Sequence, residues 1–121
     1  MREIKFRAWD KENKRMLYVS DINFCGEEIS AYDREEYIGF NYIELMQFTG
    51  RQDINGKEVY EGDIVKCFDN YYKMYYIGVV DFADCSFVIK NDACTYYRWQ
   101  DYRVEIVGNI YENPELLEGV K

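Results

Sequence analysis

The chain has 121 residues, which is enough for one folded domain, and 48% of them are hydrophobic, as is typical of an ordered globular protein. It contains 15 Lys and Arg against 23 Asp and Glu, a formal net charge of −8, and it has no histidine. Without imidazole, histidine-assisted catalysis and zinc sites that need His ligands are excluded. Since the sequence also has no Gly-rich phosphate loop and no acid pair that specifies a cleft, we expect no catalytic residues, no metal and no cofactor.

The four cysteines, at positions 25, 67, 85 and 94, form no Cys-x-x-Cys pair, so an all-cysteine zinc site has no support. No secretory signal precedes the strand-like residues 4–8, and no apolar run is long enough to span a membrane. We expect a soluble protein in the reducing cytoplasm, with free cysteines. Cys67 stands in an apolar run, where a thiol acts as a small buried hydrophobe.

Residues that favour extended strands are abundant, including 13 Tyr, so the predicted fold is mainly β. In residues 4–8, apolar and basic side chains alternate with the period of a half-buried strand. Residues 16–19 follow a polar turn as the return strand, which predicts an N-terminal hairpin within residues 1–20. Residues 21–41 are acidic and are predicted to be an exposed excursion that could include a short helix.

In residues 42–121, short apolar segments alternate with turns. Strands are expected at 43–48, 64–68, 73–80, 87–90 and 104–110, while 96–99 fit either a strand or a helical turn. The Asn55-Gly56 pair predicts a type I′ turn, in which both central residues have positive φ. Strands at this spacing indicate a small closed or nearly closed barrel. Asn113, followed by Pro114, predicts a short C-terminal helix that Asn113 caps.

Three blocks of the sequence occur in the order known from one protein family. They are residues 1–10 (MREIKFRAWD), residues 45–65, which begin LMQFTG, and residues 107–117 (VGNIYENPELL). In these blocks the chain resembles the YopX family of phage and prophage proteins. The resemblance implies a β-rich fold with an SH3-like barrel and an additional N-terminal β element, in a protein from a bacterial host cell. It implies no activity.

The middle block contains a set of turn-forming residues. We interpret them as structural, because glycine supplies positive φ and Asp or Asn binds nearby backbone amides; a cation or partner site is the alternative. Other paired acids, such as Glu27-Glu28 and Glu35-Glu36, are interpreted as a solvated surface. The signature turn residues are Gly50, Asp53, Asn55, Gly56, Tyr60, Glu61, Gly62 and Asp63.

Two clusters interleave aromatic residues with cations. Such surfaces can stack unpaired bases or bind a peptide, but packing in the core or at a subunit interface is the favoured interpretation. The candidate interaction surface consists of Tyr71, Tyr72, Tyr75, Tyr76, Tyr96, Tyr97, Arg98 and Trp99.

Positive charge is concentrated at the N-terminus, where residues 1–15 contain six Lys and Arg and three Asp and Glu. This candidate basic patch could contact phosphates, although packing against an acidic surface of the same or another copy is favoured. Its members are Arg2, Lys5, Arg7, Lys11, Lys14 and Arg15.

The leading hypothesis is a non-enzymatic protein-interaction module that forms homo-oligomers and contacts a phage or host protein. Single-stranded nucleic-acid binding, through the tyrosine-rich strands and the basic hairpin, is the alternative. A third hypothesis is an acidic mimic of DNA that inhibits a host protein. No membrane partner is expected.

Overall fold

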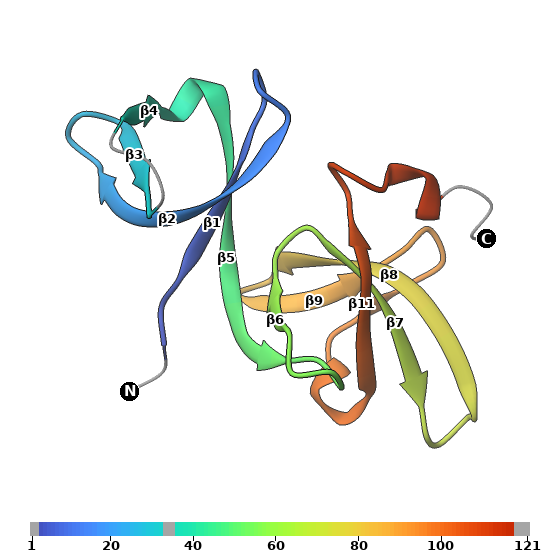
Figure 1. The fold of residues 1–121 in the computed structure, drawn as a ribbon. Helices are drawn as coiled ribbons and strands as arrows, with labels where there is room; N and C mark the ends of the chain where they lie inside the picture. The colour runs from blue at the N-terminus through green and yellow to red at the C-terminus, as the bar shows by residue number, and fades with distance from the viewer. Residues whose placement is uncertain (1–2, 33–35, 118–121) are drawn as a thin grey trace. The chain divides into compact units, whose positions relative to one another are not determined.

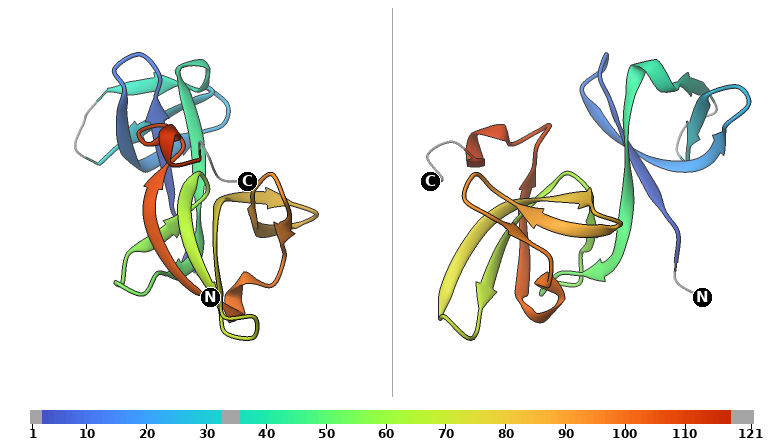
Figure 2. Two further views of the ribbon diagram at one scale, coloured as in Figure 1. Left: turned by 90° about the vertical axis from the view of Figure 1, so that its right-hand side faces the viewer. Right: turned by 180° about the vertical axis from the view of Figure 1, so that it is seen from behind.

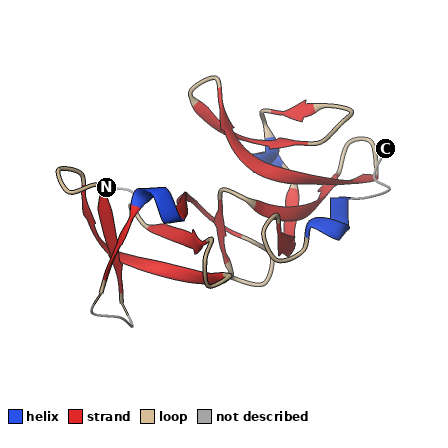
Figure 3. Ribbon diagram, turned by 90° about the horizontal axis from the view of Figure 1, so that it is seen from above, coloured by secondary structure: helices blue, strands red, loops and turns tan. Residues whose placement is uncertain are grey.

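The structure is a computed structural model that describes residues 3–32 and 36–117. The chain divides into two compact units, Met1–Phe48 and Thr49–Lys121. Strands make up 59% of the structure and pair in antiparallel sheets, while helical segments are short (Figure 3). The prediction of a mainly β fold is confirmed.

The first unit is built around the predicted N-terminal hairpin (Figure 1). Strand β1 (Phe6–Asp10) pairs with β2 (Arg15–Asn23) on one side and with β5 (Ile43–Gln52) on the other. Strands β3 (Glu28–Ala31) and β4 (Tyr37–Gly39) continue the sheet beyond β2. A 3₁₀ turn, η1 (Phe40–Tyr42), leads from β4 into β5.

The hairpin turn is held by the carboxylate of Asp10, which is only 2% exposed. It accepts hydrogen bonds from the backbone amides of Glu12 and Asn13, at 3.1 and 3.2 Å, and from the side chain of Arg15 at 2.9 Å. These bonds close the loop between two strands whose register pairs Asp10 with Arg15. The polar turn that the sequence indicates is therefore organised by one buried acid.

Residues 21–41 differ from the predicted excursion, because they contribute two strands to the sheet. Ile29 of β3 is fully buried and forms the core of the first unit with Ala8 and Ile43, and Ile38 of β4 packs against it. The only helical turn among the described residues of this segment begins at Phe40. The sequence did not predict these strands because they are only four and three residues long, too short to show a clear alternation of apolar and polar residues, and because the segment is acidic.

The second unit is an antiparallel sheet in the order β10-β9-β8-β7-β11. Its strands are coloured from green to red in Figure 2. Strand β5 continues into this unit, where β6 pairs with its end. One face of the sheet covers a core that includes Val65, Cys67, Val80 and Val104. The elements are β6 (Glu58–Tyr60), β7 (Asp63–Asp69), β8 (Met74–Ala83), β9 (Ser86–Lys90), β10 (Thr95–Tyr96), η2 (Trp99–Asp101), β11 (Arg103–Asn109) and η3 (Pro114–Leu117).

Two features of the predicted barrel region are not found among residues 3–32 and 36–117. The sheet is open, since its outer strands β10 and β11 do not pair with each other. The predicted short C-terminal helix is not an α-helix, because only a single 3₁₀ turn, η3, forms over Pro114–Leu117. The side chain of Asn113 does not act as the predicted helix cap, because its oxygen accepts the amide of Asn109 at 3.2 Å. Residues 96–99, which fit two predictions, contain the end of β10 and the start of η2.

The Asn55-Gly56 turn is not of type I′. Gly56 has a positive φ of 81°, but Asn55 does not. Instead, the Asp53 carboxylate accepts the amides of Asn55 and Lys57 at 2.8 and 2.9 Å. The loop is therefore held by hydrogen bonds to the aspartate side chain at its start, and not by the backbone geometry of a type I′ turn.

Candidate functional site

Among the described residues, no group of three or more Cys, Asp and Glu side chains could hold a metal ion. No helix in that part of the chain is long and apolar enough to cross a membrane. The four cysteines are free, and Cys67 is the buried one. Burial raises the pKa of the Cys67 thiol to about 11.

The signature turns connect parts of the second unit. Besides the two amides of its own loop, Asp53 accepts the amide of Ile106 in β11 at 3.0 Å, and Ile54 donates its amide to Val104 at 2.9 Å. The loop therefore covers backbone groups on the outer edge of β11, which would otherwise be open to strand pairing. Gly50, which precedes this loop, has a positive φ of 90°.

The Tyr60–Asp63 turn leads into β7. Gly62 has a positive φ of 84°, and the carboxylate of Asp63, 2% exposed, accepts the amide of Tyr60 at 2.8 Å. The Gly62 amide in turn donates to the carbonyl of Val80 at 2.8 Å. Glu61 lies between Tyr60 and Gly62 in the same turn. These contacts give the turn a structural role.

One residue of this region was not among the predicted site residues. Arg51 donates hydrogen bonds to the backbone carbonyls of Trp99, at 2.6 Å, and Tyr102. Its guanidinium also lies 5.1 Å from the centre of the Trp99 ring. Burial lowers the pKa of Arg51 below its ordinary value. Sequence patterns gave no signal for this residue, because its partners lie about 50 positions further along the chain.

The two predicted tyrosine clusters are divided between core and surface. The rings of Tyr76 and Tyr96 contact each other at a tilt, with centres 4.8 Å apart, and both pack against the core. Trp99 is only 5% exposed. By contrast, Tyr97 is half exposed and donates a hydrogen bond to Asp84 at 2.9 Å. The neighbouring Arg98 is exposed.

Three exposed rings, which we call the hairpin-end tyrosines, lie in the turn between β7 and β8 and at the start of β8. They are Tyr71, Tyr72 and Tyr75, with 84%, 66% and 63% of their surface exposed. The carboxylate of Asp69 accepts the amides of Tyr71 and Tyr72 at 2.8 and 3.3 Å, and the Asp69 carbonyl accepts the amide of Lys73 at 2.8 Å. The aromatic surface is therefore presented by a hydrogen-bonded turn.

Next to Tyr75, on the face of the sheet away from the core, lies a pocket of about 390 Å³, which we call the β7–β11 pocket. Tyr75 forms part of its wall: its ring centre is 4.8 Å from that of Phe68 and 4.5 Å from the Lys66 ammonium. The pocket is lined by Ile54, Lys66, Phe68, Tyr75, Arg103, Val104 and Glu105.

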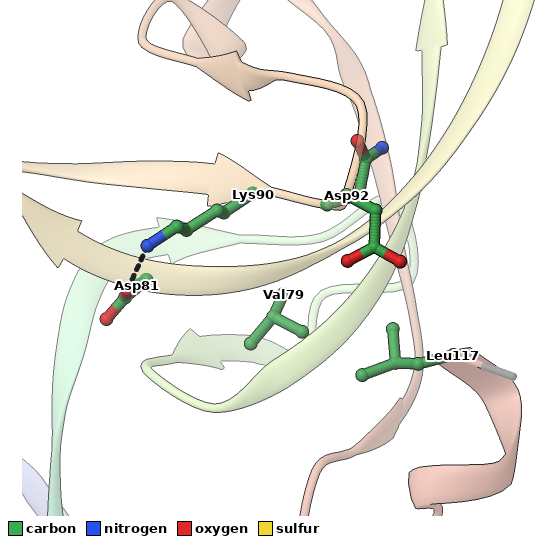
Figure 4. Close-up of a pocket in the computed structure, with 6 residues that line it drawn as sticks. Val79, Asp81, Lys90, Asp92 and Leu117 are labelled. Carbon is green, nitrogen blue, oxygen red and sulfur yellow. Dashed lines mark ion pairs between the residues drawn. The ribbon is translucent and has the colours of Figure 1, made fainter. Parts of the chain in front are cut away.

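A smaller pocket, of about 250 Å³, lies beside β8 and β9 (Figure 4). Its lysine, Lys90, reaches Asp81 at 3.7 Å, and Val79, Asp92 and Leu117 also line the pocket. Because its cation is already paired, this pocket is less suited to an anionic group than the β7–β11 pocket.

The predicted basic patch does not present a set of uncompensated cations. Lys5 pairs with Glu3 at 3.1 Å, and Lys11 pairs with Glu44 at 3.6 Å. Arg15 contacts two acids, Asp10 at 2.9 Å and Glu36 at 3.3 Å. The remaining members are Arg7, which is buried, Lys14, which is exposed, and Arg2, which lies outside the described residues.

Fold and surfaces define a small antiparallel β protein in two units, with structural turns and exposed aromatic side chains. The chain belongs to the YopX family, whose model, described as YopX protein, matches residues 5–118. It is 37% identical to the SPbeta prophage-derived uncharacterized protein YopX of Bacillus subtilis (strain 168), over 96% of this chain and 97% of that protein. The resemblance seen in the sequence is confirmed.

Two solved structures are similar to the whole chain. The crystal structure of protein EF1440 from Enterococcus faecalis has a TM-score of 0.70 and 29% sequence identity, covering 98% of this chain and all of that one. The X-ray structure of yopX from Bacillus subtilis has a TM-score of 0.65 and 25% identity, with both chains covered completely.

Proposed function

We propose that the chain is a non-enzymatic protein-interaction module that self-associates. The hairpin-end tyrosines carry this proposal, because all three expose well over half of their surface at one end of the second unit. Tyr and other aromatic side chains are enriched in the centres of protein interfaces, where they bury a large area with few rotatable bonds. Met74, 52% exposed in the same hairpin, adds apolar surface.

The turn geometry supports the same role. Since the Asp69 hydrogen bonds hold the backbone of Tyr71 and Tyr72, docking these rings would order less of the chain than docking an open loop. Tyr71 and Tyr72 already contact each other edge to face, with ring centres 4.8 Å apart. Like charge between copies opposes association, so moderate salt should strengthen it.

Size-exclusion chromatography with light scattering, at tens of micromolar protein, tests the proposal. We expect the wild type to elute as an oligomer and the double variant Tyr71→Ser, Tyr72→Ser to shift to the mass of one chain. Tyr32→Ser is the matched control, because Tyr32 is 79% exposed but belongs to the first unit. A monomeric wild type, or equal dissociation of the control, would contradict self-association through this surface.

The other two hypotheses have weaker support. The ion pairs of Lys5, Lys11 and Arg15 reduce the phosphate-binding capacity of the N-terminal hairpin. Mimicry of DNA is supported only by the net charge of −8. Labelled single-stranded oligonucleotides at low salt provide the check, since binding there would favour the nucleic-acid hypothesis.

We also propose a phage or prophage origin, a cytoplasmic location and an SH3-like part of the fold for this protein. The prophage-derived relative supports a phage or prophage origin. We place the protein in the cytoplasm of the bacterial host, with a phage or host protein as its partner. Although this sheet is open, we propose that its strands β7, β8, β9 and β11 correspond to the SH3-like part of the fold that the family resemblance implies. Cell fractionation of an expressing host would test the location, because recovery in the membrane or periplasmic fraction would contradict it.

A further inference from the structure

We propose that the β7–β11 pocket binds a protein segment in which one carboxylate lies beside an apolar or aromatic side chain. This inference rests on the proposed interaction function and gives the module a ligand chemistry. The pocket combines a cationic part, Lys66 and Arg103, with an apolar part that includes Ile54 and Phe68. The cationic part would bind the carboxylate of such a segment, and the apolar part would contact its neighbouring apolar or aromatic side chain.

The register of the strands places the two cations on one face of the sheet. Arg103 of β11 lies opposite Phe68 of β7, and Lys66 lies two residues before Phe68. Diagonal neighbours of this kind have Cα atoms about 7–8 Å apart, so one carboxylate can contact both flexible side chains. Within residues 3–32 and 36–117, neither Lys66 nor Arg103 forms an ion pair. These two cations are notable on a chain whose net charge is −8.

The acid that lines the pocket limits the charge of the ligand. Glu105 lies opposite Lys66 in the register, so a second carboxylate of a ligand would approach a like charge. A segment with one acidic residue therefore fits better than a polyanion. Removal of the Glu105 charge should strengthen binding.

The aromatic wall favours side-chain insertion over base stacking. The ring of Tyr75 already contacts Phe68 and the ammonium of Lys66. A stacked base needs an open ring face, whereas an inserted aliphatic or aromatic side chain can contact ring edges together with Ile54, which is 53% exposed. Of the two classes of macromolecule, the pocket thus fits a protein segment better than a single-stranded nucleic acid.

The test uses isotope-labelled full-length protein and the blocked peptide acetyl-Gly-Ser-Tyr-Glu-Leu-Ser-Gly-amide, titrated in nuclear magnetic resonance spectra at low salt. We expect saturable shifts of the amides of Phe68, Tyr75 and Val104. The dissociation constant should rise at least fivefold in Lys66→Gln or Arg103→Gln and fall in Glu105→Gln. The controls Lys90→Gln and Arg98→Gln remove the same charge from exposed positions outside the pocket and should leave binding unchanged.

Three results would overturn the inference: no saturable shifts, equal binding of the peptide with Gln in place of Glu, or equal weakening in the controls. Tighter binding of a labelled ten-nucleotide oligothymidine at the same amides would overturn it in favour of nucleic acid. Light scattering on the same samples separates this inference from the proposed function. If wild type assembles through the hairpin-end tyrosines but does not bind the peptide, only the pocket assignment fails.

Discussion

The guanidinium of Arg51 lies 5.1 Å from the centre of the Trp99 ring and donates a hydrogen bond to the Trp99 carbonyl at 2.6 Å. The same side chain also donates to the carbonyl of Tyr102. One arginine near the end of β5 therefore satisfies two carbonyls around η2 and stacks on an indole that is 5% exposed. The indole itself donates to the carbonyl of Phe87 at 2.9 Å, so the contact joins β5, η2 and β9 within the second unit.

Replacing Arg51 should therefore destabilise the second unit. Arg51→Ala is expected to lower the free energy of unfolding by about 2–3 kcal/mol, because it removes charged hydrogen bonds and leaves partly buried carbonyls without their donor. Urea denaturation followed by tryptophan fluorescence measures this loss. Arg98→Ala, at an exposed position next to Trp99, should change stability by less than about 0.5 kcal/mol. Equal effects of the two variants would show that the Arg51 contacts contribute little.

Asp53 should make stability depend on pH in the acid range. Burial acts to raise the pKa of Asp53, but hydrogen bonds from the amides of Ile106, Lys57 and Asn55 outweigh it and hold the pKa below its ordinary value. A depressed folded-state pKa contributes stability that is present above the unfolded value, about 4, and is lost as pH falls through the folded value.

Asp53→Asn should therefore be less stable than wild type at pH 7, and the difference should shrink at pH 3. Urea denaturation at both pH values measures the difference in the free energy of unfolding. Asp92→Asn, which changes an exposed carboxylate, is the control. A difference that stays constant between the two pH values would show that ionisation of Asp53 does not contribute.

Local patterns predicted what depends on neighbouring residues. Alternation in residues 4–8 and 16–19 predicted the hairpin of β1 and β2, and the apolar segments of residues 42–121 correspond to most strands of the second unit. Gly62 and Asp63 form the turn that their residue types indicate. These features follow from periodicity and turn chemistry, which act over only a few residues.

The features that the sequence did not predict depend on contacts between residues that no local pattern links. Asp53 closes its own loop and also binds Ile106 in β11, a partner 53 positions away that no local pattern indicates. Asn113 is a good helix cap by residue type, but its side-chain oxygen accepts a hydrogen bond from the amide of Asn109 instead. Its side chain also occupies the space where a Cβ at position 108 would lie, which explains why a glycine stands there. Tyr75 and Tyr76 are consecutive in β8 and so point to opposite faces of the sheet, which leaves Tyr75 63% exposed while Tyr76 packs against the core.

A side chain at position 62 should strain the turn before β7. Gly62→Ala is expected to cost about 1–2 kcal/mol, because L-residues pay that amount for the left-handed conformation that Gly62 adopts at a φ of 84°. Thermal unfolding followed by circular dichroism measures the loss. Gly39→Ala is the control: Gly39 has a φ of −66°, and a Cβ there would make ordinary contacts of 3.5 Å or more. An unchanged melting temperature for Gly62→Ala would contradict the structural role of this turn.

The four thiols should react in two kinetic classes. Cys25, Cys85 and Cys94 are exposed, whereas Cys67 is fully buried and its pKa is raised to about 11 by that burial, so little of it is thiolate at neutral pH. Titration of the native protein with a chromogenic disulfide at pH 8 should release three equivalents quickly, and the fourth only in denaturant. In Cys67→Ala, the fast phase should be unchanged and the slow one absent. Rapid reaction of all four thiols in the native wild type would mean that the core of the second unit opens readily at β7.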